Sequence, residues 1–363
     1  MSVLINKKIL FVHFGQSSFV KEDLKILTKA HTIHEFYYNV KKSKWVITTT
    51  LAYLITFAKQ TIWLLRHTPR ADLIYCWFAD FHAFIPALFS KIFNIPLLVV
   101  IGGVDGVSNN ELKYGVFASK WRAPLSRFII NHANCLLPVD DSLIEATSVA
   151  KYWGEAYPNG IKYHMPNLNT NWEKLPTGYN SGLWEMGPGD RPKRVLTVAL
   201  INSIKRFRIK GIDLLLKSSF YLPDYSFTII GVTNEMRSFI NKEYNLGNNV
   251  TLLPPLDRED LVSHYKKASI YAQLSRSEGL PNVLCEAMLC GCVPVGSPVF
   301  GIPKAILVPE LIVYKPYPKL VADTIIFAHE KFNKQRLQFR DHIHKNFALE
   351  LREQKLLSLI DAY

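Results

Sequence analysis

Two glutamates, Glu278 and Glu286, lie in a segment where a strand is expected to give way to a helix. Pro281 stands where a first helical residue is well tolerated, and the opening turn leaves the amides of residues 279–283 free to bind an anion. Glu286 falls one turn after Asn282, and helical side chains lean towards the amino end of their helix, so Glu286 is expected to point towards Glu278. Carboxylates accept hydrogen bonds from vicinal hydroxyls, and free amides suit phosphate oxygens. A sugar joined to a nucleotide through a diphosphate supplies both; the alternative is that the two glutamates are solvated charges favoured by the helix dipole.

The string around these glutamates resembles the E-x7-E signature of the family 4 glycosyltransferases, S-x-x-E-G-F-P-N-V-L-L-E-A-M followed by a glycine and a Pro-Val pair. The matching residues are Ser275, Glu278, Gly279, Pro281, Asn282, Val283, Leu284, Glu286, Ala287, Met288, Gly291, Pro294 and Val295. So long a match rarely arises by chance. The resemblance implies that Glu278 contacts the hydroxyls of the donor sugar and Glu286 the ribose. It also implies that Gly279, Leu280, Pro281 and Asn282 belong to the donor-binding loop.

A basic stretch over residues 206–216 resembles the KG-x-D-L-L segment of the same family, in which an arginine and a lysine hold the donor diphosphate. Lys210 takes the place of the lysine. Arg206 is our choice for the arginine, with Arg208 or Lys205 as alternatives, because the spacing differs from the common R-x4-K. Cations facing a diphosphate neutralise the charge that grows as the leaving group departs. An exposed basic turn is the structural alternative.

Weaker resemblances lie on either side. Residues 157–161 are similar to the family's P-N-G-I-D turn with Lys162 in place of the acid, and residues 300–303 are similar to G-G-I-P-E with Phe300 in place of the first glycine. Both departures fall where the family binds the donor sugar. Gly231 and Pro255 fall where the family lines the nucleotide, and both are predicted donor contacts.

The amino-terminal half matches the family in pattern only. Its strands are followed by candidate acceptor loops over residues 15–18, 77–82 and 102–105. Gly15 permits close backbone approach and is a predicted donor contact. Asp105 is the carboxylate most suited to orient or deprotonate an acceptor hydroxyl; the alternative is a turn aspartate that caps its own backbone.

Short apolar runs alternate with helical patterns along the chain, which indicates parallel sheets with ligands at the carboxyl ends of the strands. Turn-rich residues at 158–193 interrupt this pattern and indicate an interdomain connection. The resemblance implies an α/β chain of GT-B fold, two Rossmann-like domains facing each other across a cleft. We expect an acceptor-binding domain over residues 1–165, a linker over 166–193 and a nucleotide-sugar-binding domain over 194–340. Residues 341–363 are expected to form a helix that packs back on the first domain, as in the resembled family.

The composition limits the alternatives. The 363 residues have a formal net charge of +13, which favours anionic partners. The five cysteines are odd in number and lack zinc-site spacing, which indicates reduced thiols in a cytoplasmic protein. No D-x-D occurs, which argues against the metal-dependent glycosyltransferase architecture, and no G-x-G-x-x-G follows the first strand, which argues against a nicotinamide enzyme. We therefore expect no metal site and no cofactor.

The apolar segment over residues 45–65 is predicted to be a buried helix of the first domain; the alternatives are an interfacial helix on anionic lipid and a spanning helix. The basic charge and this segment suggest a peripheral location on the inner face of the cytoplasmic membrane. The expected partners are a nucleotide-sugar donor, a glycan or lipid-linked acceptor and an anionic membrane surface. Nucleic acid is not expected, because the cations are spread along the chain and no recognisable motif for it occurs.

The resemblance thus implies a retaining glycosyltransferase (hexosyltransferase) that moves a sugar from a nucleotide diphosphate sugar to a hydroxyl acceptor, a lipid-linked or surface polysaccharide precursor. No evident nucleophile is available on the opposite face of the donor sugar, which favours front-face displacement. A GT-B-shaped nucleotide-sugar epimerase is the enzyme alternative. A basic nucleic-acid-binding protein is the alternative from another class.

Overall fold

The computed structural model describes residues 6–15, 17–40, 46–145 and 159–363. By their contacts, these residues form two units. The first unit consists of the described residues up to 145 together with Asn159–Pro176 and Leu351–Tyr363, and the second consists of Thr177–Glu350. Each unit is built on its own parallel sheet.

The sheet of the first unit has five parallel strands in the order β2-β1-β3-β4-β5. The strands are β1 (Lys8–His13), β2 (Thr32–Tyr37), β3 (Leu73–Trp77), β4 (Leu97–Ile101) and β5 (Cys135–Pro138). β3, β4 and β5 are buried along their whole length, and their continuous apolar sequences are typical of strands covered on both faces. The chain reverses its direction of travel across the sheet between β1 and β3, which is where α/β sheets usually bind ligands.

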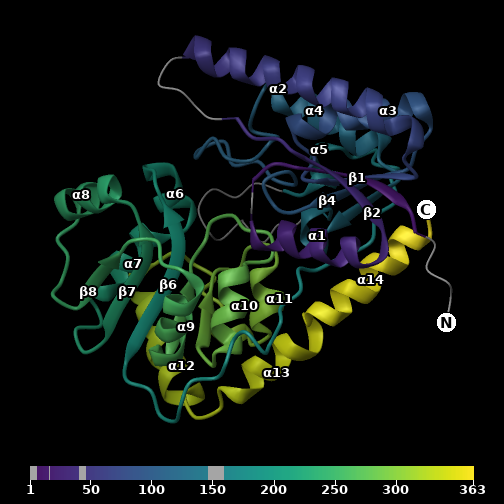
Figure 1. Cartoon of the computed structure of the whole chain (residues 1–363). Coiled ribbons are helices and arrows are strands. Elements are labelled where there is room, and N and C mark those ends of the chain that lie inside the picture. Colours follow the sequence, from purple (N-terminus) through teal and green to yellow (C-terminus); the bar gives the residue numbers. More distant parts are fainter. Residues whose placement is uncertain (1–5, 16, 41–45, 146–158) are drawn as a thin grey trace. The chain divides into compact units, whose positions relative to one another are not determined.

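Helices cover both faces of this sheet (Figure 1), with α2, α3 and α4 on one side and α1 and α14 on the other. Their bounds are α1 (Ser18–Ala30), α2 (Val46–His67), α3 (Phe84–Phe93), α4 (Arg122–His132), α5 (Ile161–His164) and α14 (Leu349–Asp361), with the short helices η1 (Thr68–Arg70), η2 (Phe81–Ala83) and η3 (Asp141–Leu143). Among the described residues, no helix is both long and apolar enough to cross a membrane.

A buried ion pair joins α14 to α1 inside the first unit. The Arg352 guanidinium donates to both carboxylate oxygens of Asp23, at 2.6 and 2.7 Å. Asp23 is fully buried and also accepts hydrogen bonds from the Tyr75 hydroxyl at 2.7 Å and the Trp77 indole at 2.8 Å. Because a buried carboxylate is costly unless it is paired and hydrogen-bonded, these four donors explain how Asp23 is tolerated in the core.

The second unit also has five parallel strands, in the order β10-β9-β6-β7-β8. They are β6 (Arg194–Ile201), β7 (Ser226–Val232), β8 (Val250–Leu253), β9 (Ile270–Gln273) and β10 (Val293–Gly296). β6 and β9 are hydrogen-bonded neighbours although 68 residues separate the end of one from the start of the other. The chain thus reverses its direction of travel across this sheet between β6 and β9, as it does between β1 and β3 in the first sheet, and we call this position the switch point. The loops that leave the carboxyl ends of β6 and β9 start side by side there.

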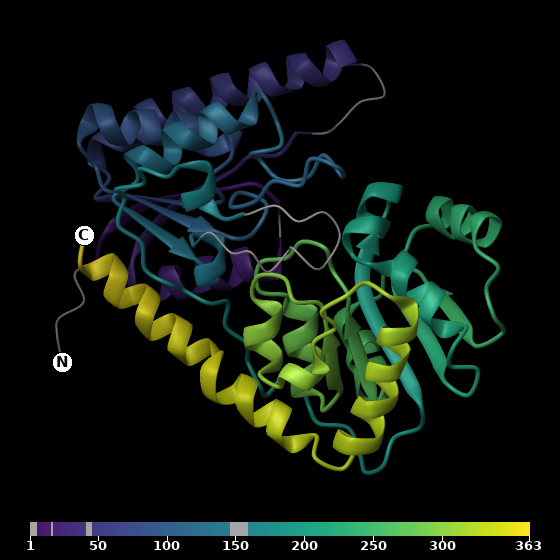
Figure 2. The same ribbon diagram turned by 180° about the vertical axis from the view of Figure 1, so that it is seen from behind.

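α9 and α10 cover one face of the second sheet, towards the viewer in Figure 1, and α12 covers the opposite face, which is in front in Figure 2. The helices are α6 (Ile204–Ile209), α7 (Ile212–Ser219), α8 (Asn234–Glu243), α9 (Arg258–Lys267), α10 (Asn282–Leu289), α11 (Ile302–Ile306), α12 (Pro318–Phe332) and α13 (Leu337–Asn346), with the short η5 (Pro309–Leu311). The expectation of two parallel-sheet α/β domains is therefore confirmed.

The turn-rich stretch over 158–193 is divided between the two units. Residues up to Pro176 belong to the first unit, where the Leu136 amide donates to the Asn171 carbonyl at 2.9 Å and the Leu175 amide to the Pro138 carbonyl at 2.8 Å. This segment thus runs along β5 without forming a regular strand. Its lack of apolar periodicity gave no sign of this pairing.

Candidate active site

The side chains of Lys210 and Glu278 meet at the switch point of the second sheet. The Lys210 ammonium lies 2.6 Å from the Glu278 carboxylate, and both side chains are partly buried. Lys210 follows β6 and α6, whereas Glu278 lies in the loop between β9 and α10. The pairing of β6 with β9 therefore brings together two predicted site residues that are 68 positions apart in sequence.

Gly211 makes the approach of Lys210 to the β9 loop possible. Its φ is +67°, and a Cβ added there would lie 1.8 Å from the Leu274 carbonyl oxygen. The Arg276 amide donates to the Ile209 carbonyl at 2.7 Å, which fastens the two loops together through their backbones. Only glycine accommodates both the left-handed backbone and this contact.

A second ion pair fixes the loop that holds Glu278. The Arg276 guanidinium binds the Asp213 carboxylate in a bidentate manner, at 2.8 and 2.9 Å, and also donates to the Arg208 carbonyl. Two parallel hydrogen bonds of this kind set orientation as well as distance. Sequence reasoning missed both residues as members of the site, although Asp213 is the aspartate of the KG-x-D-L-L segment and Arg276 lies inside the S-x-x-E string.

Polar side chains buried beneath the loop support it further. The Gln273 amide donates to the Ser275 hydroxyl at 2.8 Å and approaches the Glu278 carboxylate at 3.5 Å. The Ser297 hydroxyl donates to the Ser275 carbonyl at 2.6 Å. Gln273 and Ser297 were also missed, because single polar residues at the ends of strands have no distinctive sequence pattern.

α10 begins at Asn282, one residue later than expected, and Pro281 is its N-cap. No side chain caps the helix. The Asn282 carboxamide instead accepts a hydrogen bond from the Tyr179 hydroxyl at 2.8 Å, which orients it from within the same unit. Leu280 and Pro281 are buried, and the Gly279 carbonyl accepts from the Gly301 amide at 3.0 Å. The first turn of α10 is thus held in place while its amides keep the polarity that suits an anion.

Glu286 lies one turn into α10, beside Tyr265, whose hydroxyl is 3.5 Å from its carboxylate. Burial raises the pKa of Glu286 to about 7, although Arg258 opposes the shift. Burial raises the pKa of the Tyr271 phenol, and a backbone hydrogen bond from Val198 opposes this shift. The negative charges of Glu286 and Glu278 raise the same pKa further. Glu286 is therefore a carboxylate short of hydrogen-bond donors, as expected of a group that a ligand's hydroxyls could satisfy.

The helical conformation of residues 204–209 distinguishes Arg206 from Arg208 as candidate partners of Lys210. Arg206 is four residues before Lys210, and the Lys210 amide donates to its carbonyl at 2.9 Å, so the two residues lie one turn apart on the same side. Arg208 is two residues away and points elsewhere. Arg206 is exposed. This helix was not expected, and it favours Arg206 as the companion of Lys210.

Two predicted nucleotide contacts have different surroundings from each other. Gly231 is buried in β7 with φ +100°, and a Cβ there would lie 2.1 Å from the Ala199 carbonyl of β6. Its lack of a side chain is therefore explained by the packing of two strands where β6 is irregular. Pro255 is exposed in the loop after β8. Among the described residues, neither is hydrogen-bonded to Lys210 or Glu278.

In the first unit, Asp105 is fully buried. Its carboxylate accepts hydrogen bonds from the amides of Ala79, Gly102 and Gly103 at 2.9–3.0 Å. Burial raises its pKa to about 6, and the hydrogen bonds from the Ala79 and Gly103 amides oppose the shift. The Asp105 carboxylate thus ties the loop after β4 to the loop after β3, as the alternative of an aspartate bound to nearby backbone predicts, and its role towards an acceptor hydroxyl stays a prediction.

Other features of the first unit surround the same strand ends. Gly15 has φ +87° and open space where a Cβ would be, so its conformation alone requires glycine. His82 is buried, its Nε2 lies 2.7 Å from the Trp77 carbonyl, and burial lowers its pKa to about 4. Asn159 bonds to both the amide and the carbonyl of Ser108, at 3.0 and 2.8 Å. The rest of the expected P-N-G-I-D turn, residues 157 and 158, lies outside the described residues, as do residue 16 and residues 41–45.

No group of three or more His, Cys, Asp or Glu side chains could hold a metal ion in the part of the chain that the structure describes. All five cysteines are buried and free. Burial raises the pKa of Cys292 to about 11, and its thiol donates to the Tyr265 carbonyl at 3.2 Å. The Cys290–Cys292 turn is thus packed into the unit around Arg191, which bonds to the Cys290 carbonyl.

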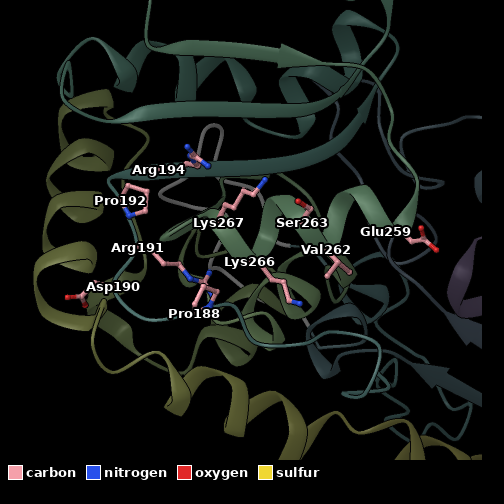
Figure 3. Close-up of a pocket in the computed structure, with 10 residues that line it drawn as sticks. All are labelled: Pro188, Asp190, Arg191, Pro192, Arg194, Glu259, Val262, Ser263, Lys266 and Lys267. Carbon is pink, nitrogen blue, oxygen red and sulfur yellow. The ribbon is translucent and has the colours of Figure 1, made fainter.

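A cavity of about 590 Å³ lies on the side of the second unit where the strands begin, by the amino end of β6 (Figure 3). Arg194, Lys266, Lys267, Asp190 and Glu259 are among the residues that line it. None of the predicted site residues does so. Because ligands of such sheets bind at the carboxyl ends of strands, we place the site at Lys210 and Glu278 and not in this cavity.

Comparison with known proteins finds relatives for part of the chain. Residues 191–344 match the family model described as glycosyl transferases group 1. A D-inositol 3-phosphate glycosyltransferase of Mycobacterium sp. (strain KMS) is 32% identical over 135 residues, covering 33% of this chain and 30% of that protein. An uncharacterized glycosyltransferase of Haemophilus influenzae is 35% identical over 158 residues, covering 42% of this chain and 40% of that protein. The matched part thus spans under half the length of these curated relatives.

Solved structures match almost the whole chain. Sucrose-phosphate synthase from Thermosynechococcus elongatus has a TM-score of 0.72 at 16% identity, covering 98% of this chain and 99% of that one. Anabaena HepE in complex with UDP has a TM-score of 0.70 at 13% identity, covering 98% and 100%. At such identities the likeness shows the fold, which is GT-B. Residues 191–344 of this chain therefore match the model of the group 1 glycosyltransferases, within a chain that has the GT-B fold.

Proposed function

We propose that this protein is a retaining glycosyltransferase, which transfers a sugar from a nucleotide diphosphate sugar to a hydroxyl acceptor. The observation that carries the proposal is the Lys210–Glu278 pair, 2.6 Å apart, at the switch point of a group 1 glycosyltransferase domain. A cation for the diphosphate and a carboxylate for the sugar hydroxyls are side by side there. The HepE structure, of similar fold, is a complex with UDP, which supports a nucleotide ligand here.

Each residue has a distinct task in this proposal. Lys210 and Arg206 hold the diphosphate, together with the uncapped amides that open α10. Glu278 accepts hydrogen bonds from the donor sugar, and Glu286 accepts them from the ribose. The bond between the anomeric carbon and the diphosphate oxygen breaks, and the bond to the acceptor oxygen forms on the same face. The acceptor proton passes to the departing diphosphate oxygen, and Lys210 stabilises the negative charge that develops there.

The same proposal assigns no metal to the reaction, because cations and helix amides do the work of charge neutralisation. Activity retained after chelation, and not raised by added Mg²⁺ or Mn²⁺, would support this assignment. Loss of turnover after a chelator is added, with recovery when Mg²⁺ or Mn²⁺ is restored, would contradict the metal-free assignment.

The acceptor is proposed to be a lipid-linked or growing surface polysaccharide, used at the inner face of the cytoplasmic membrane. The chain's net charge of +13 supports an acceptor that is itself anionic or lies on an anionic surface.

Nucleotide sugars can be identified by thermal unfolding, because a ligand that binds only the native state raises the midpoint. The best stabilising donor is then incubated with candidate acceptors, and the anomeric configuration of the product is determined by NMR. A product with the donor's configuration, formed only when acceptor is present, is the expected result. Conversion of the donor sugar without acceptor would indicate an epimerase, and an inverted product would refute retention.

A further inference from the structure

One face of α2 consists of aliphatic side chains that no part of the described chain covers. We name it the outer face of α2, and it comprises Leu51, Leu54, Ile55, Ala58, Ile62 and Leu65. The five larger side chains are between 46% and 67% exposed. Their spacing of three and four residues places them on one stripe of the helix, about 20 Å long at about 1.5 Å per residue.

The opposite face of α2 is already packed against the first unit. Leu64 and Gln60 are fully buried, and the Gln60 amide donates to the His82 carbonyl at 2.8 Å. The Phe57 ring lies 5.4 Å from the ring of Tyr38. The helix is thus anchored by one apolar face and presents a second. Soluble helices rarely do this, and exposed apolar patches of this kind mark interaction sites.

The charged residues of α2 and of the sequence that flanks it are all of one sign. No acidic residue occurs between Glu35 and Asp72, whereas six Lys or Arg residues do. Lys59 and Arg66 belong to α2 and Arg70 follows it, all three exposed. The other three, Lys41, Lys42 and Lys44, precede the helix and lie outside the described residues. An aliphatic stripe bordered by cations matches a surface that is apolar inside and anionic outside.

We propose that the outer face of α2 inserts into the interfacial region of an anionic lipid bilayer and holds the protein on the membrane surface. The aliphatic side chains enter the boundary between headgroups and acyl chains, while Lys59 and Arg66 bind lipid phosphates. A protein partner fits less well, because the stripe is convex and offers no acid and few hydrogen-bonding groups. The proposal rests on the proposed function only for the presence of an acceptor at the membrane, and binding to lipid needs no turnover.

Vesicle flotation tests the proposal with the full chain. Wild-type protein is expected to float with vesicles of phosphatidylcholine and phosphatidylglycerol and to bind pure phosphatidylcholine far less. Leu54→Glu/Ile62→Glu should weaken partitioning about a hundredfold or more, since each large aliphatic side chain contributes at least about tenfold when buried. Lys59→Gln and Arg66→Gln should each weaken it about fivefold, on anionic vesicles only. Leu337→Glu is the matched control, because Leu337 is a similarly exposed leucine, at 56%, on α13.

A second measurement does not depend on the glutamate variants. All native cysteines are buried, so Ile62→Cys provides one exposed thiol for an environment-sensitive fluorophore. Its emission should shift to the blue when anionic vesicles are added, as the label leaves water.

Three results would overturn the proposal. The first is wild-type protein that binds neither kind of vesicle, with no shift of the label. The second is equal binding by wild type and the double glutamate variant, or equal loss in the Leu337→Glu control. The third is self-association in light scattering that the double variant abolishes while vesicles do not compete, which would assign the face to a second copy of the chain. Loss of glycosyl transfer in a variant that still floats bears only on the proposed function.

Discussion

Replacing Lys210 by alanine separates a role in the reaction from a role in folding. The Lys210 and Glu278 side chains are 27% and 15% exposed, and their charges are 2.6 Å apart. Pairs that still contact water contribute little to stability, so the variant should lose only about 1 kcal/mol of unfolding free energy. For a unit of this size, about 1 kcal/mol lowers the thermal midpoint by roughly 2–4 °C.

The expected effect on turnover is much larger. Removing one preorganised group that stabilises charge in a transition state costs about 2.7–4 kcal/mol, which is about a hundred- to a thousandfold in kcat. The difference arises because the charge on the diphosphate grows as the sugar leaves, while the charge on Glu278 in the free enzyme remains accessible to water. Initial rates of nucleoside diphosphate release, at saturating donor and acceptor, measure this effect.

Lys266→Ala is the matched control. Lys266 is 31% exposed and pairs with Glu185 at 2.7 Å in the same unit, but it lines the cavity by the amino end of β6. The Lys266→Ala variant should keep the wild-type kcat and show a similarly small change in thermal midpoint. Near wild-type kcat in Lys210→Ala, or an equal loss in Lys266→Ala, would refute the assignment of Lys210 to the leaving group.

Three further perturbations test other parts of the structure. Glu286 has a pKa of about 7, and ribose hydroxyls bind its ionised form better. The affinity for a nucleotide sugar, measured by calorimetry, should therefore rise between about pH 6 and 8 and level off above about pH 8. Glu286→Gln should bind weakly and show no such rise. The same raised pKa makes the contribution of Glu286 to stability of the free protein greatest below about pH 4.5 and lost as the pH rises through about 7, a slope that is absent in the glutamine variant. Gly211→Ala should cost more than about 2 kcal/mol in denaturant unfolding, because of its φ of +67° and the 1.8 Å contact; a change below about 0.5 kcal/mol would contradict this. Asp23→Asn leaves a buried arginine unpaired and should cost about 3–5 kcal/mol, whereas Glu353→Gln breaks an exposed pair and should cost under about 1 kcal/mol; equal costs would disprove the argument.

Much of the fold follows from local sequence. The apolar runs that became β1, β3 and β4 are continuous because parallel strands are buried on both faces, and such runs are easily recognised. β2 is harder to recognise, because Thr32–Tyr37 mixes polar and apolar residues, as an edge strand does, and its pairing with β1 is not encoded locally. α6 is difficult to recognise from local sequence because it is short and basic and lacks a long apolar stripe.

The candidate site divides in the same way. The string around Glu278 and the Lys210 segment could be identified because each is a contiguous stretch whose residue types serve one loop or helix start. The ion pair between Arg276 and Asp213 could not be identified from sequence, because it joins residues 63 positions apart. The sequence context of Asp105 fits both a carboxylate that orients an acceptor and a turn aspartate that binds backbone amides, and the structure shows the backbone contacts.

The sequence by itself therefore determined the alternation of strands and helices, the resemblance of residues 191–344 to the group 1 glycosyltransferases and the candidate residues for charge and hydroxyl chemistry. Only the tertiary structure decided which of them meet: the order of strands puts β6 beside β9, and that adjacency brings Lys210 to Glu278. It also decided that Asp105 is buried and that α2 keeps an uncovered aliphatic face. The physical reason is that burial and long-range pairing depend on what packs against a residue, and a linear pattern records the residue without its neighbours in space.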